Sequence, residues 1–172
     1  MVAYGLAVEP SKTGGLRFGN QALHHSPQDG LKRPKTFTFL GFTHYVGRSR
    51  TGRFVVGRKT EGKRLRRKLK QLSERLRDLR AQGGKTMMAF LHAYLHGHIQ
   101  YYGVSGNSRS LRCYLHEAGR LLFKWRMRRS QRRSVPWGRM SPILNALLPK
   151  PRIVHQLYPV PKWKAQAGSR MV

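Results

Sequence analysis

Three stretches between residues 61 and 127 carry hydrophobic residues at helical spacing. Over 61–82 leucines recur every three or four positions, which predicts a helix with a narrow apolar seam ending at the glycines 83–84. Residues 86–102 are apolar nearly all round, which is typical of the central helix of a small bundle. A third helix is expected after residue 106, capped by Asn107 or Ser108. The predicted buried positions are Leu65, Leu69, Leu72, Leu76 and Leu79, then Met87, Met88, Phe90, Leu91, Tyr94, Leu95, Ile99 and Tyr102, then Leu111, Leu115, Leu122 and Trp125.

The part of the chain before these helices has the pattern of β-strands. Residues 36–46, with alternating phenylalanines, and residues 53–59 are the two longer apolar runs. The connection GRSRTG is short and ends in glycine, which predicts a hairpin with a basic tip. Residues 6–8 are expected to form a short strand, and residues 19–35, with Gly, Pro, Asn and Asp, are expected to form a loop.

Beyond Ser134 the chain is rich in proline, and we expect a short helix near 139–147 followed by extended chain. The predicted fold class is α+β, mainly α: a short β hairpin, a three-helix bundle and an extended C-terminal segment. The corresponding boundaries are 1–60, 61–134 and 135–172.

Charge narrows the choice of partner. The chain has 35 Lys and Arg residues against 6 Asp and Glu, a net charge of +29, and the basic residues run from Lys12 to Arg170. Such self-repulsion opposes compaction unless a nucleic acid, an anionic membrane or an acidic protein lies nearby. Neither an apolar run of membrane-spanning length nor a signal-peptide pattern occurs, so nucleic acid is the favoured partner and no membrane is expected. The single cysteine, Cys113, excludes an internal disulfide and a multi-cysteine zinc site, and it fits a cytoplasmic location.

The few acidic residues argue against catalysis by this chain. Two-metal phosphoryl transfer needs clustered carboxylates, and only Glu74 and Asp78 have i, i+4 spacing. We interpret both as helix-surface residues that pair with Arg75 and its neighbours. The chain is therefore not expected to polymerise or cut nucleic acid alone, and no metal or cofactor is predicted.

Three short motifs lack the context that their best-known functions require. The GGKT of 83–86 has Leu79 where a phosphate-binding P-loop needs glycine. His92 and His96 are spaced as in zinc proteases, but alanine follows His92 where glutamate is needed. The GVSG of 103–106 matches a G-x-x-G loop that clamps RNA, although a helix connection with flexible glycines is the favoured interpretation.

The strongest motif is distributed along the chain. Aromatic residues are interleaved with Lys and Arg along the predicted helices. Lys and Arg would neutralise phosphates, while the aromatic side chains would stack on unpaired bases. Core packing is favoured for Tyr94 and Trp125. The stacking candidates are Tyr101, Tyr102, Tyr114 and Trp125.

Four blocks follow one another along the chain: GLAVEPSKT, TFTFLGFTHY, GHIQYYGVSGNSRSL, and KWRMRRSQRR with LPKPRIVHQLY after it. Their combination, order and spacing resemble the group II intron-encoded reverse transcriptase/maturases of bacteria, from Gly5 to about Tyr158. The resemblance implies that 1–60 is the end of a palm with its hairpin and that 61–134 is the thumb, or maturase domain X. Residues 135–172 would form a short helix and a Pro-rich basic segment. Phe39, Leu40, Gly41 and Phe42 resemble the segment that supports the primer.

The chain departs from this family in lacking the Tyr-x-Asp-Asp polymerase motif, which would lie before residue 1, and the zinc-type endonuclease domain. We therefore expect a C-terminal fragment: a gene remnant, a truncated protein or one piece of a split protein.

The expected function is that of an RNA-binding maturase domain that helps a mobile group II intron to fold and splice, without reverse transcriptase activity of its own. The alternative is the thumb portion of a split or truncated RNA-directed DNA polymerase whose catalytic half is elsewhere. Expected partners are structured intron RNA and, beyond it, a DNA target or a separate reverse transcriptase half. The 103–112 loop and the basic helices would make most contacts. The predicted RNA-binding residues are Lys63, Arg64, Arg66, Arg67, Lys70, Tyr101, Tyr102, Asn107, Arg109, Arg112, Lys124, Arg128, Arg129, Arg132 and Arg133.

Overall fold

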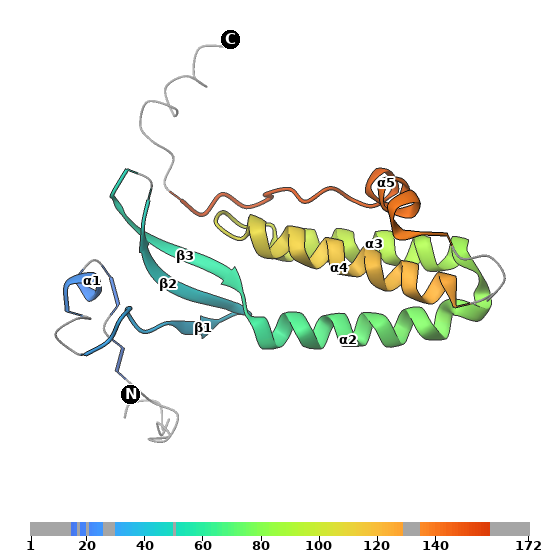
Figure 1. Cartoon of the computed structure of the whole chain (residues 1–172). Coiled ribbons are helices and arrows are strands. Elements are labelled where there is room, and N and C mark those ends of the chain that lie inside the picture. The colour runs from blue at the N-terminus through green and yellow to red at the C-terminus, as the bar shows by residue number, and fades with distance from the viewer. Residues whose placement is uncertain are drawn as a thin grey trace, which may run out of the picture. The chain divides into compact units, whose positions relative to one another are not determined.

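The computed structural model describes residues 15–16, 18–19, 21–25, 30–49, 51–128 and 135–158. These residues form a three-stranded antiparallel sheet followed by helices, so the predicted α+β, mainly α class is confirmed (Figure 1). The elements in chain order are α1 (Ala22–His25), β1 (Phe37–Phe39), β2 (Phe42–Arg48), β3 (Phe54–Thr60), α2 (Gly62–Asp78), the 3-10 helix η3 (Leu79–Gln82), α3 (Gly84–Tyr102), α4 (Ser108–Met127) and α5 (Trp137–Leu147).

The chain divides into two compact units. The first contains the described residues up to Phe39 together with 43–57. The second, called the helical unit below, contains Leu40–Phe42 and the described residues from Arg58 onward. The described part of the C-terminal segment therefore belongs with the helices.

The sheet corrects the prediction of a single strand over 36–46. Leu40 and Gly41 have positive φ values of 49° and 78°, so the chain reverses between β1 and β2. Positive φ at both central residues is the signature of a type I′ hairpin turn. A leucine seldom adopts that conformation, which is why the sequence did not predict the turn. The β2–β3 hairpin forms as predicted.

Two further expectations concern the chain before the sheet. The short helix α1 occupies part of the predicted loop 19–35. This helix has four residues, and at its start the Ala22 amide donates a hydrogen bond to the Gly19 carbonyl at 3.2 Å. The strand expected at 6–8 lies outside the described residues.

The helical unit is built on α2, α3 and α4, and its core follows the predicted apolar positions. Leu72, Leu76 and Leu79 are buried, while Leu65 and Leu69 at the start of the seam are partly buried. On α3 the buried residues fall on one side, and His92 and His96 are exposed on the other. The sequence predicted a central helix that is apolar nearly all round, and the structure leaves one side of it exposed. The buried side chains of α3 and α4 are Met87, Leu91, Leu95, His98, Ile99, Tyr102, Leu111, Tyr114, Leu115, Ala118 and Leu122.

After α4 the described chain resumes at residue 135. Helix α5 begins after Pro136, two residues earlier than predicted, and Met140 and Leu144 are its buried residues. Extended chain follows, and His155 forms a parallel β-bridge with Val104. None of the described helices is long and apolar enough to cross a membrane.

Candidate nucleic-acid interface

One basic surface follows helix α2. The leucine seam faces the core, and the charged positions between the leucines are therefore turned outward. The exposed predicted residues are Lys63, Arg66, Arg67 and Lys70, and Arg64 is half-buried. Lys68 lies differently, with its amine 4.9 Å from the centre of the Tyr102 ring. Burial, and then the charge of Arg64, lowers the pKa of Lys68.

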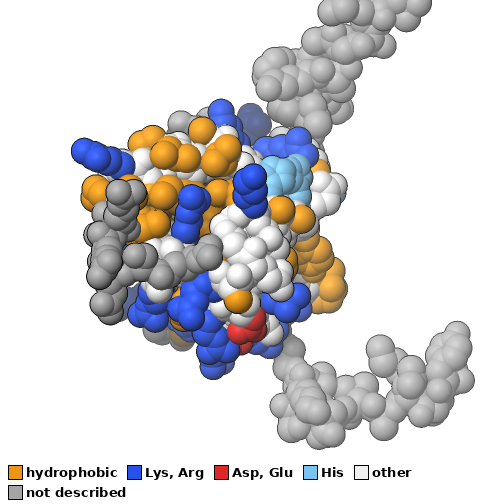
Figure 2. Space-filling model, turned by 90° about the vertical axis from the view of Figure 1, so that its right-hand side faces the viewer, with side chains coloured by type: hydrophobic (Ala, Val, Ile, Leu, Met, Phe, Trp, Pro, Cys, Tyr) orange, Lys and Arg blue, Asp and Glu red, His pale blue; other side chains and the backbone are white. Residues whose placement is uncertain are grey.

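A second basic surface follows helix α4. Arg109 and Arg112 are exposed near its start, and Lys124 and Arg128 are exposed near its end. The last two flank Trp125, with cationic groups 5.4 and 5.1 Å from the ring centre. Figure 2 shows lysine and arginine side chains spread over one face of the molecule, with acidic side chains confined to a small area. The remaining predicted residues of this stretch, Arg129, Arg132 and Arg133, lie outside the described residues.

The 103–107 loop is covered by the C-terminal segment. The amides of Val154 and His155 donate to the Gly103 carbonyl at 2.6 and 2.9 Å, and the Ser105 amide donates to the His155 carbonyl at 3.1 Å. Gly103, Ser105 and their neighbour at 104 are buried. The expectation that the 103–112 loop and the basic helices make most of the RNA contacts therefore needs correction over 103–105, where the backbone hydrogen-bonds to protein instead.

Asn107 is the polar anchor of this turn. Its amide nitrogen donates to the Tyr102 carbonyl at 2.8 Å and to Thr60 Oγ1 at 2.9 Å, while Oδ1 accepts from the Thr60 backbone amide at 2.8 Å. The side chain is 1% exposed and makes no capping hydrogen bond to α4. Asn107 was predicted both as a side-chain cap and as an RNA contact. The structure gives it neither role, since its polar atoms are used internally.

Among the predicted stacking tyrosines, only Tyr101 offers a sizeable exposed surface, at 48%. Its hydroxyl donates to the Leu40 carbonyl at 2.8 Å, and its ring stacks on Phe42. Tyr102 and Tyr114 are buried, so an RNA base cannot reach either ring in this conformation. Tyr102 is thus a core residue and not the RNA contact that the sequence suggested.

His98 lies between these two buried tyrosines. Its ring stacks on Tyr114 at 3.7 Å and on Tyr102 at 4.5 Å between centroids. Neither ring nitrogen has a hydrogen-bond partner among the described residues. Burial, and then the nearby charge of Lys68, lowers the pKa of His98 to about 3. The ring is therefore neutral near pH 7 and acts as a flat packing element.

The primer-support-like residues divide into two exposed and two buried positions. Phe39 and Leu40 are 60% and 65% exposed, whereas Gly41 and Phe42 are buried. The Phe42 ring contacts Tyr102 in the core at 5.3 Å. The β1–β2 turn thus presents apolar surface at Leu40 while Phe42 anchors its other side in the helical unit.

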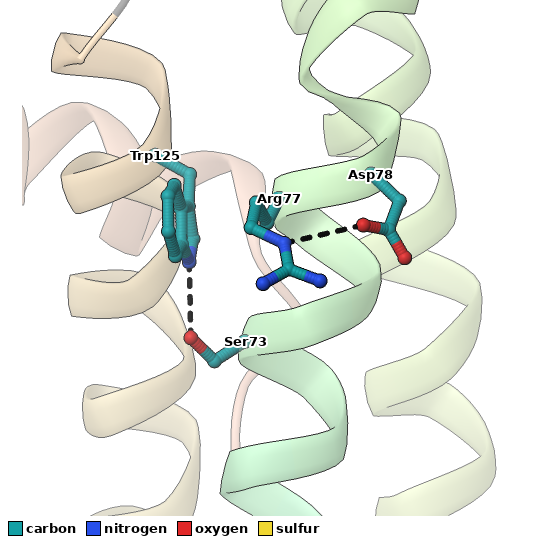
Figure 3. A network of polar contacts seen from close by, with 4 residues as sticks. All are labelled: Ser73, Arg77, Asp78 and Trp125. Atoms are coloured by element: carbon teal, nitrogen blue, oxygen red, sulfur yellow. Dashed lines mark hydrogen bonds and ion pairs between the residues drawn. The ribbon is translucent and has the colours of Figure 1, made fainter.

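Sequence reasoning missed a groove between α2 and α4 of about 420 Å³. The Trp125 indole in its wall donates to Ser73 Oγ at 3.0 Å (Figure 3). The groove is lined by Leu69, Lys70, Ser73, Glu74, Arg77, Glu117, Leu121 and Trp125. The spacing of residues 70, 73, 74 and 77 indicates that they share one face of α2. It could not indicate which helix packs beside that face, because α4 lies about fifty residues later.

The acidic residues form no metal centre in the described part of the chain. Asp78 pairs with Arg77 at 3.3 Å, as expected for a surface ion pair, whereas the pairing expected for Glu74 is not found among the described residues. Glu117 pairs with His116 and Arg120 at 3.3 and 3.9 Å. The arrangement offers cations, a few hydrogen-bond acceptors and aromatic surface, which is the chemistry of binding to a polyanion.

Comparison of the chain with protein-family models, with curated proteins and with solved structures finds no match.

Proposed function

We propose that this protein is an RNA-binding domain of the maturase type, which holds a structured group II intron RNA and assists its folding and splicing. The observation that carries the proposal is the exposure of cations along α2 and α4 in a chain with a net charge of +29. Both helices turn their leucines inward, so the cations form surfaces on a packed scaffold. The sequence resemblance supplies the class of RNA.

Fewer residues are proposed to contact the RNA than the sequence suggested. Arg109 and Arg112 extend from the first turns of α4, beside the buried loop that fixes the position of the helix. Lys63, Arg66 and Arg67 supply the corresponding surface on α2. These side chains would bind phosphates and orient the RNA without reading its sequence.

Salt dependence tests this proposal directly. If the protein engages six to ten phosphates, its affinity for a transcribed intron RNA should fall about 10³–10⁵-fold between 50 and 200 mM salt. Arg109→Ala and Arg112→Ala should each lower the slope of log affinity against log salt by about 1. Both variants should keep the wild-type melting temperature because these side chains are exposed. Arg139→Ala, an exposed charge removal on α5, is the matched control and should leave the slope unchanged.

Affinity that hardly changes with salt would contradict the electrostatic account. A large fall in melting temperature in the Arg109 or Arg112 variant would instead show that the arginine is structural. Circular dichroism melts with and without RNA distinguish a prefolded domain from one that orders on binding.

A second candidate function is the thumb of a reverse transcriptase whose catalytic half is a separate polypeptide. The exposure of Phe39 and Leu40, at the turn that resembles a primer-support segment, favours it. Primer extension by a separately expressed catalytic half, measured with and without this chain, tests the idea. Unchanged extension would count against it, and extension by this chain alone would overturn the proposal that it is not an enzyme.

A further inference from the structure

The groove between α2 and α4 differs chemically from the cationic surfaces around it. Its apolar lining includes Leu69, Leu121 and Trp125. Two of the chain's six carboxylates, those of Glu74 and Glu117, line it. Two cations, Lys70 and Arg77, line it as well, so the groove is mixed in charge where the surfaces around it are cationic. Its carboxylates accept hydrogen bonds, so the groove is suited to a group that donates hydrogen bonds and has a flat apolar face.

The helix register places Glu74 beside Trp125. The indole of Trp125 bonds to Ser73, which precedes Glu74 on α2. Glu117 precedes Trp125 by eight residues on α4, which corresponds to about 12 Å along the helix axis. The Trp125 ring and the Glu74 carboxylate therefore share one end of the groove, and Glu117 lies toward the other.

Glu74 also differs from the other groove carboxylate in its ion pairs. Glu117 is paired with His116 and Arg120, whereas Glu74 forms no ion pair within the described part of the chain. The neighbouring arginines of α2 have other partners. Arg75 lies over the Phe90 ring. Arg77 lines the groove as well, and its guanidinium bonds to Asp78 (Figure 3). Among the described residues, therefore, no cation is paired with Glu74, and its carboxylate can accept hydrogen bonds in the groove.

We propose that this groove binds an unpaired guanine base of the RNA, stacked against Trp125, with the Glu74 carboxylate accepting from its N1–H and exocyclic N2–H. The inference rests on the proposed RNA-binding function and adds base selectivity to it. Lys70, Lys124 and Arg128 lie around the groove and Trp125, where they would hold the flanking phosphates.

Guanine is favoured by the arrangement of its donors. Its Watson–Crick edge presents two adjacent N–H groups, which match the two oxygens of one carboxylate. Adenine places an acceptor at N1, and uracil offers a single N–H between two carbonyls. A carboxylate can only accept hydrogen bonds. Against adenine or uracil, at least one of its oxygens would lack a donor or would face an acceptor atom of the base. The stacking contribution from Trp125 is similar for every base and adds affinity without selectivity.

The test uses the full chain and three short RNA hairpins. Their loops consist of uridine except for one central position, which is guanosine, inosine or adenosine. Inosine lacks the exocyclic amino group and so loses one of the two donors. Wild-type affinity should fall in the order guanosine, inosine, adenosine, with about 5- to 100-fold between the first and the last.

Glu74→Gln should abolish this preference, because an amide cannot accept twice along that edge. Asp78→Asn is the matched control: it removes the same charge one turn away, outside the groove, and should raise affinity for all three hairpins while keeping the preference. Circular dichroism verifies that both variants are folded.

Equal wild-type affinity for the three hairpins would overturn the guanine site and leave RNA binding intact. A preference that survives in Glu74→Gln would overturn the role of Glu74. Failure of the wild-type protein to bind any of the hairpins or a transcribed intron RNA would instead remove the proposed function itself.

Discussion

Protonation of His98 is expected to destabilise the helical unit in mildly acidic solution. The side chain is 4% exposed and stacked between Tyr102 and Tyr114, with Lys68 as the nearby cation. Its pKa is lowered from 6.5 to about 3, mainly by burial. The unfolded chain therefore binds a proton at a pH where the folded chain does not. The resulting stability is present above pH 6.5 and is lost as the pH falls toward 3.

The size of the effect follows from the same pKa values. A pH of 5 is 1.5 units below 6.5, the pKa of this histidine in the unfolded chain, so the histidine is protonated there. In the folded chain it is still neutral at pH 5. Each unit corresponds to about 1.4 kcal/mol, so the loss relative to neutral pH is about 2 kcal/mol. For a domain of this size, that loss should lower the melting temperature by roughly 4–8 °C.

Urea denaturation followed by circular dichroism at pH 7, 6 and 5 measures this loss. His98→Phe keeps a flat ring between the tyrosines and removes the titrating group, so its stability should change less with pH than that of the wild type. His96→Gln is the control, since His96 is exposed on the same helix. Parallel pH profiles for the wild type and His98→Phe would refute the reasoning, because they would show that His98 titrates alike in both states.

Two further substitutions test the contacts that join the strands to the helices within the helical unit. Asn107→Ala leaves the Thr60 amide and the Tyr102 carbonyl without their buried partner, so we expect a loss of about 2–4 kcal/mol in the free energy of unfolding by urea denaturation. An unchanged midpoint would show that water replaces the amide. Gly41→Ala places a Cβ at a φ of 78° and against the Arg64 side chain, and it should cost at least 1–2 kcal/mol by the same assay. Equal or higher stability of this variant would show that the turn relaxes freely.

Local pattern was enough to predict the helices from α2 to α5, but not the short α1. Leu72 and Leu76 are buried because their spacing places them on one face of α2, and the buried Leu79 continues this face at the start of η3. The β2–β3 hairpin followed from its short glycine-containing connection. The turn at Leu40 and Gly41 could not be predicted in this way, because its left-handed leucine is held by contacts distant in sequence: the Phe42 ring packs on Tyr102, and the Gly41 carbonyl accepts from the Glu61 amide.

The sequence by itself determined the mainly helical class, the inward leucine faces and the excess of cations, because these depend on residue type and on spacing within one element. Only the tertiary structure decided which polar residues remain available. The polar atoms of Asn107 bond to Thr60, 47 residues away, and the buried residues 103–105 are covered by residues 154–157. Trp125 meets Ser73 across 52 residues and forms the groove that contains Glu74. Such pairings depend on how helices pack in space, and the periodicity of a single helix carries no information about its partner.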